Sequence, residues 1–224
     1  MSGPSQHFVF DAYGTLFDVH SAARQHGGVI GDAWPRLSEI WRNKQLEYTW
    51  IYARLDRHIP FREITRRALV YALTVTGQPV ALASELLDTY NRLATFPEVP
   101  DVLSALKSRG AKLAILSNGD ADMLDPLVRN AGLAGMFDAV ISVAKAGTFK
   151  PAARVYALAS DHYRIAPGSI TFLSSNRWDI AGAKSFGFET VWINRSGMPD
   201  EYPDIPAARV LPNLAPLAAE KYEA

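Results

Sequence analysis

The chain of 224 residues contains no cysteine, which excludes disulfides, thiolate metal ligands and cysteine nucleophiles together. It carries no excess charge, because 23 lysine and arginine residues balance 23 aspartate and glutamate residues. No overall field would therefore draw it to nucleic acid or to an anionic membrane. No apolar run approaches the roughly 20 residues of a membrane span, and no basic segment with a long apolar stretch opens the chain. These absences favour a soluble cytoplasmic protein whose partner is a small molecule.

Apolar residues make up 48% of the chain, enough for the core of one large domain or of a domain with a smaller subdomain. Between residues 21 and 94 they recur at helical spacing, which predicts an all-helical insertion. Its three expected helices lie within residues 37–55, 64–71 and 82–90. The run Phe96-Pro97-Glu98-Val99-Pro100 marks its end, since proline disfavours helix at the preceding position. We therefore predict domain boundaries near residues 20 and 95.

Outside this insertion, short apolar runs typical of buried strands alternate with helical segments. The first run, Phe8–Phe10, stops at Asp11 and is followed by Gly14, as where a strand enters a turn. The later runs are Lys112–Leu116, Ala139–Val143, Ile170–Leu173 and Thr190–Ile193, with an edge strand expected at Arg209–Leu211. Such alternation indicates a parallel sheet with right-handed crossovers. The predicted fold class is α/β, with a Rossmann-like parallel sheet core (residues 1–20 and 95–224) and a helical subdomain (residues 21–94) inserted after the first strand.

Polar residues follow each of the main core strands. They are Asp11 and Thr15, then Ser117 and Asn118, then Lys150, and last Ser174, Ser175, Asn176 and Asp179. In an open parallel sheet, ligands bind outside the carboxyl ends of the strands. We therefore expect a carboxylate, hydroxyls, an amide and an ammonium group to gather at one edge. Taken alone, Asp11 is equally consistent with a nucleophile and with an aspartate that forms a turn or caps a helix.

Four short motifs built on these residues are similar to those of one enzyme superfamily. They are Phe10-Asp11-Ala12-Tyr13-Gly14-Thr15-Leu16, Leu116-Ser117-Asn118-Gly119, Phe149-Lys150-Pro151 and Ser174-Ser175-Asn176-Arg177-Trp178-Asp179. In this order they resemble the motifs of the haloacid dehalogenase superfamily, and within it the chain resembles the type II L-2-haloacid dehalogenases. The resemblance runs from about Phe8 to Asn194. It includes the insertion, where Trp41-Arg42 and residues 44–50 are similar to the first helix of that group's cap.

The resemblance implies a role for each residue of the expected site. Asp11 would be a nucleophile that forms an ester, splitting one hydrolysis into two easier steps, and the Lys150 ammonium would keep it ionised. Arg42 would receive the departing halide, where a fixed cation lowers the barrier. The other catalytic residues would be Thr15, Ser174, Asn176, Asp179 and Tyr156, and the other substrate- or halide-binding residues Ala12, Tyr13, Ser117, Asn118 and Trp178. Apolar walls would come from Trp41, Phe61 and Trp178.

Two positions separate dehalogenation from phosphoryl transfer within this superfamily. Its phosphatases usually place acids where this chain has Tyr13 and Ser175, one as general acid and the other as a magnesium ligand. Without them the site loses oxygen ligands that Mg²⁺ favours, and a halide needs no proton in order to leave. A magnesium-dependent phosphatase and a catalytically silent binding member are the alternatives. The chain departs from the family pattern at Ala152 and at Arg177, which would add an anion contact if it pointed inward and change nothing if it pointed outward.

The sequence thus predicts a hydrolase that acts on carbon–halide bonds with no metal and no other cofactor. The expected substrate is a short-chain L-2-haloalkanoic acid, which water converts to a 2-hydroxyacid with inversion through an ester on Asp11. The resemblance also implies a homodimer.

Overall fold

Strand β1 (His7–Phe10) lies in the interior of a six-stranded parallel sheet in the computed structural model of the protein, which describes residues 7–219. Residues 1–6 and 220–224, the two ends of the predicted core, lie outside the described residues. The strand order is β3-β2-β1-β4-β5-β6. The other strands are β2 (Lys112–Ser117), β3 (Ala139–Ser142), β4 (Ile170–Ser174), β5 (Glu189–Ile193) and β6 (Arg209–Leu211). Phe10 pairs with Ile115 of β2 and Leu173 of β4, so three strands end side by side.

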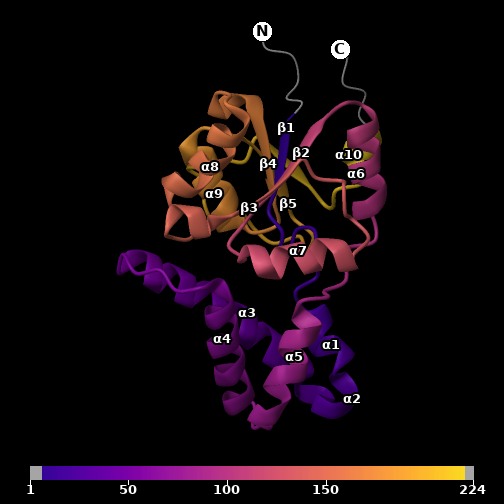
Figure 1. The fold of residues 1–224 in the computed structure, drawn as a ribbon, viewed down its shortest axis with the longest axis vertical. Helices are drawn as coiled ribbons and strands as arrows, with labels where there is room; N and C mark the ends of the chain where they lie inside the picture. Colours follow the sequence, from indigo (N-terminus) through magenta and orange to yellow (C-terminus); the bar gives the residue numbers. More distant parts are fainter. Residues whose placement is uncertain (1–6, 220–224) are drawn as a thin grey trace.

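Helices cover both faces of the sheet, which is why its central strands are apolar throughout. Helices α8 and α9 lie on one side and α6 and α10 on the other, while α7 packs beside β3 (Figure 1). Their bounds are α6 (Val99–Ser108), α7 (Ala121–Asn130), α8 (Ala153–Tyr163), α9 (Arg177–Phe186) and α10 (Pro216–Ala219). Phe8, Val9 and Phe10 are all buried, as expected for a strand covered on both faces.

The chain between β1 and α6 forms a helical cap at the carboxyl ends of the strands (Figure 1). Its helices are α1 (Ser21–Gln25), α2 (Gly27–Ile30), α3 (Trp34–Arg54), α4 (Phe61–Val75) and α5 (Ala83–Tyr90). The long helices α3 and α4 pack against each other. The predicted fold class is thereby confirmed, while the boundaries at residues 20 and 95 stay a prediction.

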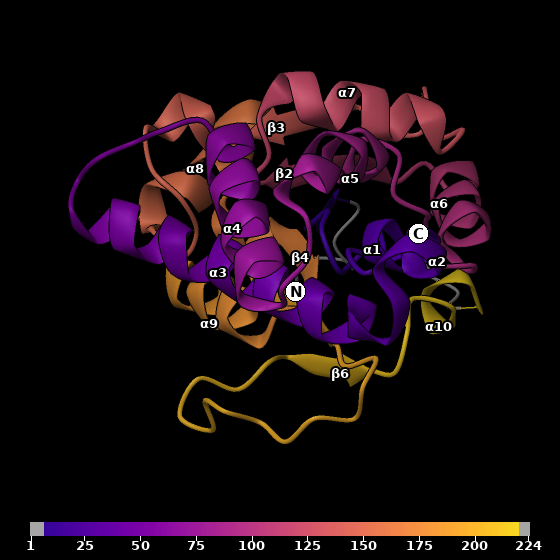
Figure 2. The ribbon, with the colours of Figure 1, turned by 90° about the horizontal axis from the view of Figure 1, so that it is seen from below.

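Two details differ from the expectation. Strand β3 ends at Ser142 rather than at Val143, because Val143 opens a short 3-10 helix. The Ser142 hydroxyl oxygen caps this helix by accepting from Ala144 N–H. Ile51 and Leu55, grouped by helical spacing with core residues, are 53% and 59% exposed. They lie at the end of α3, which extends past α4 (Figure 2). Within residues 7–219, no helix combines the length and apolar character that crossing a bilayer requires.

Candidate active site

Asp11 is the first residue after β1 and lies where the sheet meets the cap. Its backbone N–H still donates to Leu173 O of β4 at 2.9 Å, so the strand ladder fixes its position. The chain then turns at Gly14, whose φ of 88° is one that side chains rarely adopt, and the Ala12 carbonyl accepts N–H groups from the returning loop. The Asp11 side chain is buried, which removes its carboxylate from bulk water.

The two oxygens of the Asp11 carboxylate have different partners. Oδ1 accepts a hydrogen bond from Lys150 Nζ at 3.0 Å. Oδ2 accepts three: from Asn176 Nδ2 at 2.8 Å, Thr15 Oγ1 at 3.1 Å and Ser174 Oγ at 3.4 Å. Donors on every side stabilise the ionised form of a buried carboxylate. Among the described residues, Oδ1 has one donor and therefore keeps more free lone-pair capacity than Oδ2.

Backbone groups fix the direction of both hydroxyls. Thr15 Oγ1 accepts from Ser175 N–H at 2.8 Å, and Ser174 Oγ accepts from Asn176 N–H at 3.1 Å. Because each oxygen is already an acceptor, its own hydrogen is left to point at Asp11. The loop after β4 thus orients the carboxylate before any ligand arrives.

Lys150 forms a buried ionic network with two carboxylates. Its Nζ lies 3.0 Å from Asp11 Oδ1 and 2.8 Å from Asp179 Oδ2, and Tyr156 donates its hydroxyl to Asp179 Oδ1 at 2.8 Å. Burial alone would lower the pKa of Lys150, but the Asp11 and Asp179 charges outweigh it, and the pKa lies above its ordinary value. Burial raises the pKa of Asp179 to about 6, although the Lys150 ammonium opposes the rise.

The cap supplies one cation to this site. Arg42, on α3, donates through Nη2 to Asn176 Oδ1 at 3.3 Å and to the Tyr13 carbonyl at 3.2 Å. Asn176 in turn donates through Nδ2 to the same carbonyl at 3.3 Å and to Asp11. A continuous chain of hydrogen bonds therefore connects the cap arginine to the nucleophile candidate.

Aromatic side chains line the junction of cap and core. Tyr13 is buried and stacks on Tyr90 with ring centroids 5.4 Å apart, and Phe61 lies 5.6 Å from it. Burial raises the pKa of Tyr13 well above its ordinary value, so its hydroxyl stays neutral. Trp178 meets Trp50 of α3 edge-on at 5.6 Å. Trp41 is buried inside the cap, where its Nε1 donates to Thr65 O at 3.0 Å.

Ser117 and Asn118, the site residues expected at the end of β2, lie close to Asp11 but form no hydrogen bond with it among the described residues. Ser117 Oγ accepts from Gly119 N–H at 3.1 Å, and Asn118 Oδ1 accepts from Lys150 N–H at 3.0 Å. Within residues 7–219 no hydrogen bond joins either side chain to Asp11. The structure thus brings together Arg42 and seven predicted catalytic residues: Asp11, Thr15, Lys150, Tyr156, Ser174, Asn176 and Asp179. Ser117 and Asn118 keep donor groups that a ligand can use.

Arg177 points away from Asp11, the second of the two cases left open by the sequence, although its side chain is buried. Its Nε lies 2.5 Å from Asp200 Oδ1, and its Nη2 donates to the Tyr202 and Ile205 carbonyls at 2.7 Å each. It thereby fastens the loop before β6 to the start of α9.

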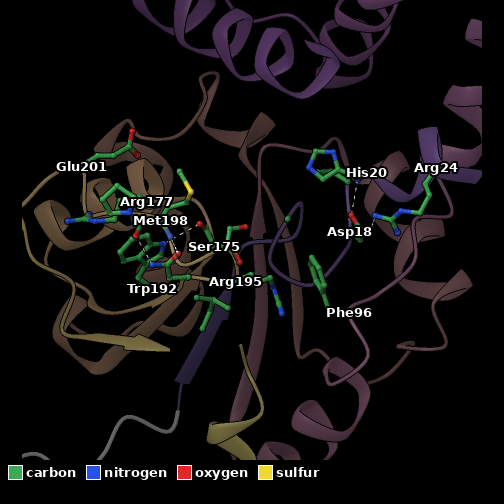
Figure 3. A pocket seen from close by; sticks show the side chains of 16 residues that line it. Asp18, His20, Arg24, Phe96, Ser175, Arg177, Trp192, Arg195, Met198 and Glu201 are labelled. Carbon is green, nitrogen blue, oxygen red and sulfur yellow. Dashed lines mark hydrogen bonds and ion pairs between the residues drawn. The ribbon is translucent and has the colours of Figure 1, made fainter. Parts of the chain in front are cut away.

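Beside that loop is a separate cavity of about 550 Å³, whose lining side chains include Ser175, Trp192 and Arg195 (Figure 3). Neither Asp11 nor Lys150 lines it.

Sequence reasoning assigned no role to Gln45, a polar residue that contacts Arg42. Gln45 is buried on α3 and its Oε1 accepts from Arg42 Nη1 at 2.8 Å. Its spacing of three residues from Arg42 places both on one helix face, a signal that could have revealed it.

Among the described residues, no cluster of three or more histidine, aspartate or glutamate side chains has the arrangement to hold a metal ion.

Known proteins resemble this chain in both sequence and fold. Residues 6–187 match the family model of haloacid dehalogenase-like hydrolases. (S)-2-haloacid dehalogenase 1 of Pseudomonas sp. strain CBS-3 is 42% identical over 216 residues, which span 96% of this chain and 95% of that protein. A crystal structure of a dehalogenase with an intermediate complex has a TM-score of 0.96 at 35% identity, covering 100% of both chains. The L-2-haloacid dehalogenase of Xanthobacter autotrophicus with chloropropionic acid covalently bound has a TM-score of 0.87 at 37% identity, covering 96% of this chain and 97% of its own.

Proposed function

The chain belongs to the haloacid dehalogenase-like hydrolases, and from this premise we propose that it hydrolyses short-chain L-2-haloalkanoic acids to 2-hydroxyacids. The relatives named above support the choice of substrate. One observation carries the proposal: the buried carboxylate of Asp11 directly follows β1, with Lys150 on one oxygen and three donors on the other. The two nearby positions that would hold acids in a phosphatase, residues 13 and 175, carry none.

In the first step an Asp11 oxygen attacks C2 of the substrate from the face opposite the halogen. A carbon–oxygen bond forms as the carbon–halogen bond breaks, the halide leaves with the electron pair, and C2 is inverted. Oδ1 suits this attack, since Lys150 is its one donor in residues 7–219. The Ser117 hydroxyl, Lys150 and loop amides hold the substrate carboxylate, while Arg42 and Asn118 receive the halide. A fixed cation beside the leaving group stabilises the charge that grows there.

In the second step water attacks the ester carbonyl carbon of Asp11. The bond between that carbon and the Asp11 oxygen now joined to C2 breaks, which releases the 2-hydroxyacid with that oxygen, leaves the oxygen of water in the restored carboxylate and leaves one proton to be removed. The configuration at C2 is therefore inverted only once. Asp179 holds Lys150 in place through its Oδ2 at 2.8 Å, so the ammonium stays beside the ester carbonyl during this attack.

The donor set does not fit the magnesium ion of superfamily phosphatases. Asp11 Oδ2 and the Tyr13 carbonyl oxygen both accept hydrogen bonds from Asn176 Nδ2. Arg42 adds its positive charge at the same carbonyl. A cation would have to displace these donors, and Ser175 offers no carboxylate to replace them. The residues present favour dehalogenation without a metal over the phosphatase alternative.

The protein is further proposed to act as a homodimer in the cytoplasm. Large apolar side chains are exposed on the cap at Ile51, Leu55, Tyr71 and Val75. A second copy that covered them would remove this surface from water. Light scattering over a range of concentrations tests the dimer, and a monomeric mass throughout would refute it. Cell fractionation tests the location.

Halide release from L-2-chloropropionate in excess chelator tests the reaction. Chloride should appear in the presence of the chelator and should be absent with Asp11→Asn. A single turnover in ¹⁸O-labelled water should place label in the Asp11 peptide, because water attacks that carboxyl carbon. Metal-dependent phosphate release without halide release would support the phosphatase instead. Product with an unlabelled Asp11 peptide would refute the ester.

A further inference from the structure

Gln45 lies one helical turn after Arg42 and is 1% exposed. All of its amide atoms have partners inside the cap. Oε1 accepts from Arg42 Nη1 at 2.8 Å, and Nε2 donates to Thr65 Oγ1 at 2.8 Å. The Tyr90 hydroxyl lies 3.2 Å from Nε2 and 3.3 Å from Oε1. A buried amide satisfied in this way has little freedom to rotate.

The hydrogen bonds determine which way the Gln45 amide faces. Thr65 donates its hydroxyl hydrogen to the Phe61 carbonyl at 2.8 Å, so Thr65 Oγ1 can only accept from Gln45. Nε2 must therefore face Thr65, which leaves Oε1 to face Arg42. The reverse orientation would place an amide N–H against a guanidinium N–H and leave both unpaired, which is costly in a buried site.

We propose that Gln45 is a positioning residue that fixes the guanidinium of Arg42 toward the departing halide. With Nη1 held by Gln45, Nη2 reaches Asn176 Oδ1 and the Tyr13 carbonyl at the edge of the reaction site. An arginine side chain without such a partner occupies many rotamers. The guanidinium then faces the halide in only a fraction of the protein molecules. This inference rests on the proposed function, because it assumes that Arg42 receives the halide.

Water is a poor substitute for the missing amide. In the intact protein the space between Gln45, Arg42, Trp41 and Tyr90 has no room for a water molecule. Replacing Gln45 by leucine, of similar size, keeps that space filled and leaves Nη1 of Arg42 without its acceptor. The guanidinium is then free to turn away from Asn176.

The effect should be confined to one chemical step. The halide leaves while the Asp11 ester forms, so a misplaced Arg42 slows ester formation. Ester hydrolysis involves no halide and depends on Lys150, Asp179 and water. A purely structural role for Gln45 would instead impair both steps together or neither.

Rapid-quench mass spectrometry of the Asp11 peptide separates the two steps with L-2-chloropropionate. Gln45→Leu should form the ester about tenfold more slowly, the change expected when a hydrogen bond to a charged group is lost. Its ester should hydrolyse at the wild-type rate, and product inhibition by bromide should weaken by a similar factor. Thr49→Val is the matched control, because Thr49 is equally buried on α3 and, within residues 7–219, its hydroxyl bonds only to the Leu46 carbonyl. It should change none of the three measurements.

Thr65→Val provides an independent test if Gln45→Leu does not fold. It removes the acceptor that fixes the amide, so ester formation should slow and ester hydrolysis should stay unchanged. Equal slowing of both steps, or wild-type rates with wild-type bromide inhibition, would overturn the inference in either variant. Failure of the wild-type protein to form any ester would instead refute the proposed function, so the two failures are distinguishable.

Discussion

Replacing Tyr156 by phenylalanine removes one hydroxyl from the buried network and keeps the ring that packs against Phe172. The lost hydrogen bond, 2.8 Å to Asp179 Oδ1, favours the ionised form of that carboxyl. A hydrogen bond to a charged group contributes about 1.5–3 kcal/mol, and about 1.4 kcal/mol corresponds to one pKa unit. The pKa of Asp179, about 6 in the intact protein, should therefore rise by roughly 1–2 units.

Activity should follow the ionised fraction of Asp179, because the charged carboxylate holds Lys150. At pH 7 that fraction falls from about 90% to about 10–50%, so halide release should drop about two- to tenfold and recover near pH 9. The assay is the initial rate of halide release from pH 5 to pH 9. Tyr163→Phe is the control, since the buried Tyr163 hydroxyl has no hydrogen-bond partner among the described residues. On the acid side of the pH profile, the rate of halide release should fall at a higher pH in Tyr156→Phe than in the wild type. A fall at the same pH, or at a lower one, would refute the reasoning.

Three further predictions concern stability and packing. Lys150→Met leaves the buried Asp11 and Asp179 carboxylates without their cation and should lower the free energy of unfolding by about 3–5 kcal/mol at pH 8. Urea unfolding should show a smaller loss at pH 5, because Asp179, whose pKa burial raises, stabilises the fold while it is protonated and loses that contribution as pH rises. Gly182→Ala would place a Cβ 2.5 Å from the Tyr156 hydroxyl and should reduce halide release, whereas Gly168→Ala meets nothing within 4 Å and should not. Arg177→Leu removes a buried cation from Asp200 and should lower the free energy of unfolding in urea by about 2–4 kcal/mol. The acid side of its pH profile should stay near pH 6, and a displaced profile would contradict the direction of Arg177 away from Asp11.

The sequence predicts the polar edge of the sheet well because a strand end is a local feature. An apolar run that stops at Asp11 or Ser174 fixes both the strand and the side of the sheet on which the next residue emerges. Parallel pairing then brings the ends of β1, β2 and β4 together without further information. The motif resemblance identifies which of these polar residues form one site.

Interactions across the cap interface could not be predicted in the same way. Arg42 and Asn176 are 134 residues apart, and their hydrogen bond depends on how far α3 descends toward the sheet. Helical periodicity also does not show that α3 extends past α4, the helix that packs against it. Ile51 lies on this extension and is exposed for that reason. The direction of Arg177 was open because its partners lie in residues 200–205, a stretch with no periodic pattern.

Asn176 connects the position of the cap to the orientation of the nucleophile. Its Oδ1 must face Arg42, because a guanidinium offers only donors, and its Nδ2 then faces Asp11 and the Tyr13 carbonyl. If α3 moved away from the sheet, Oδ1 would lose this partner and the amide could rotate off Asp11. The carboxylate is therefore fully oriented only while Arg42 is in place. A displacement of α3 from the sheet would therefore remove the halide-side cation and the amide that orients the nucleophile together.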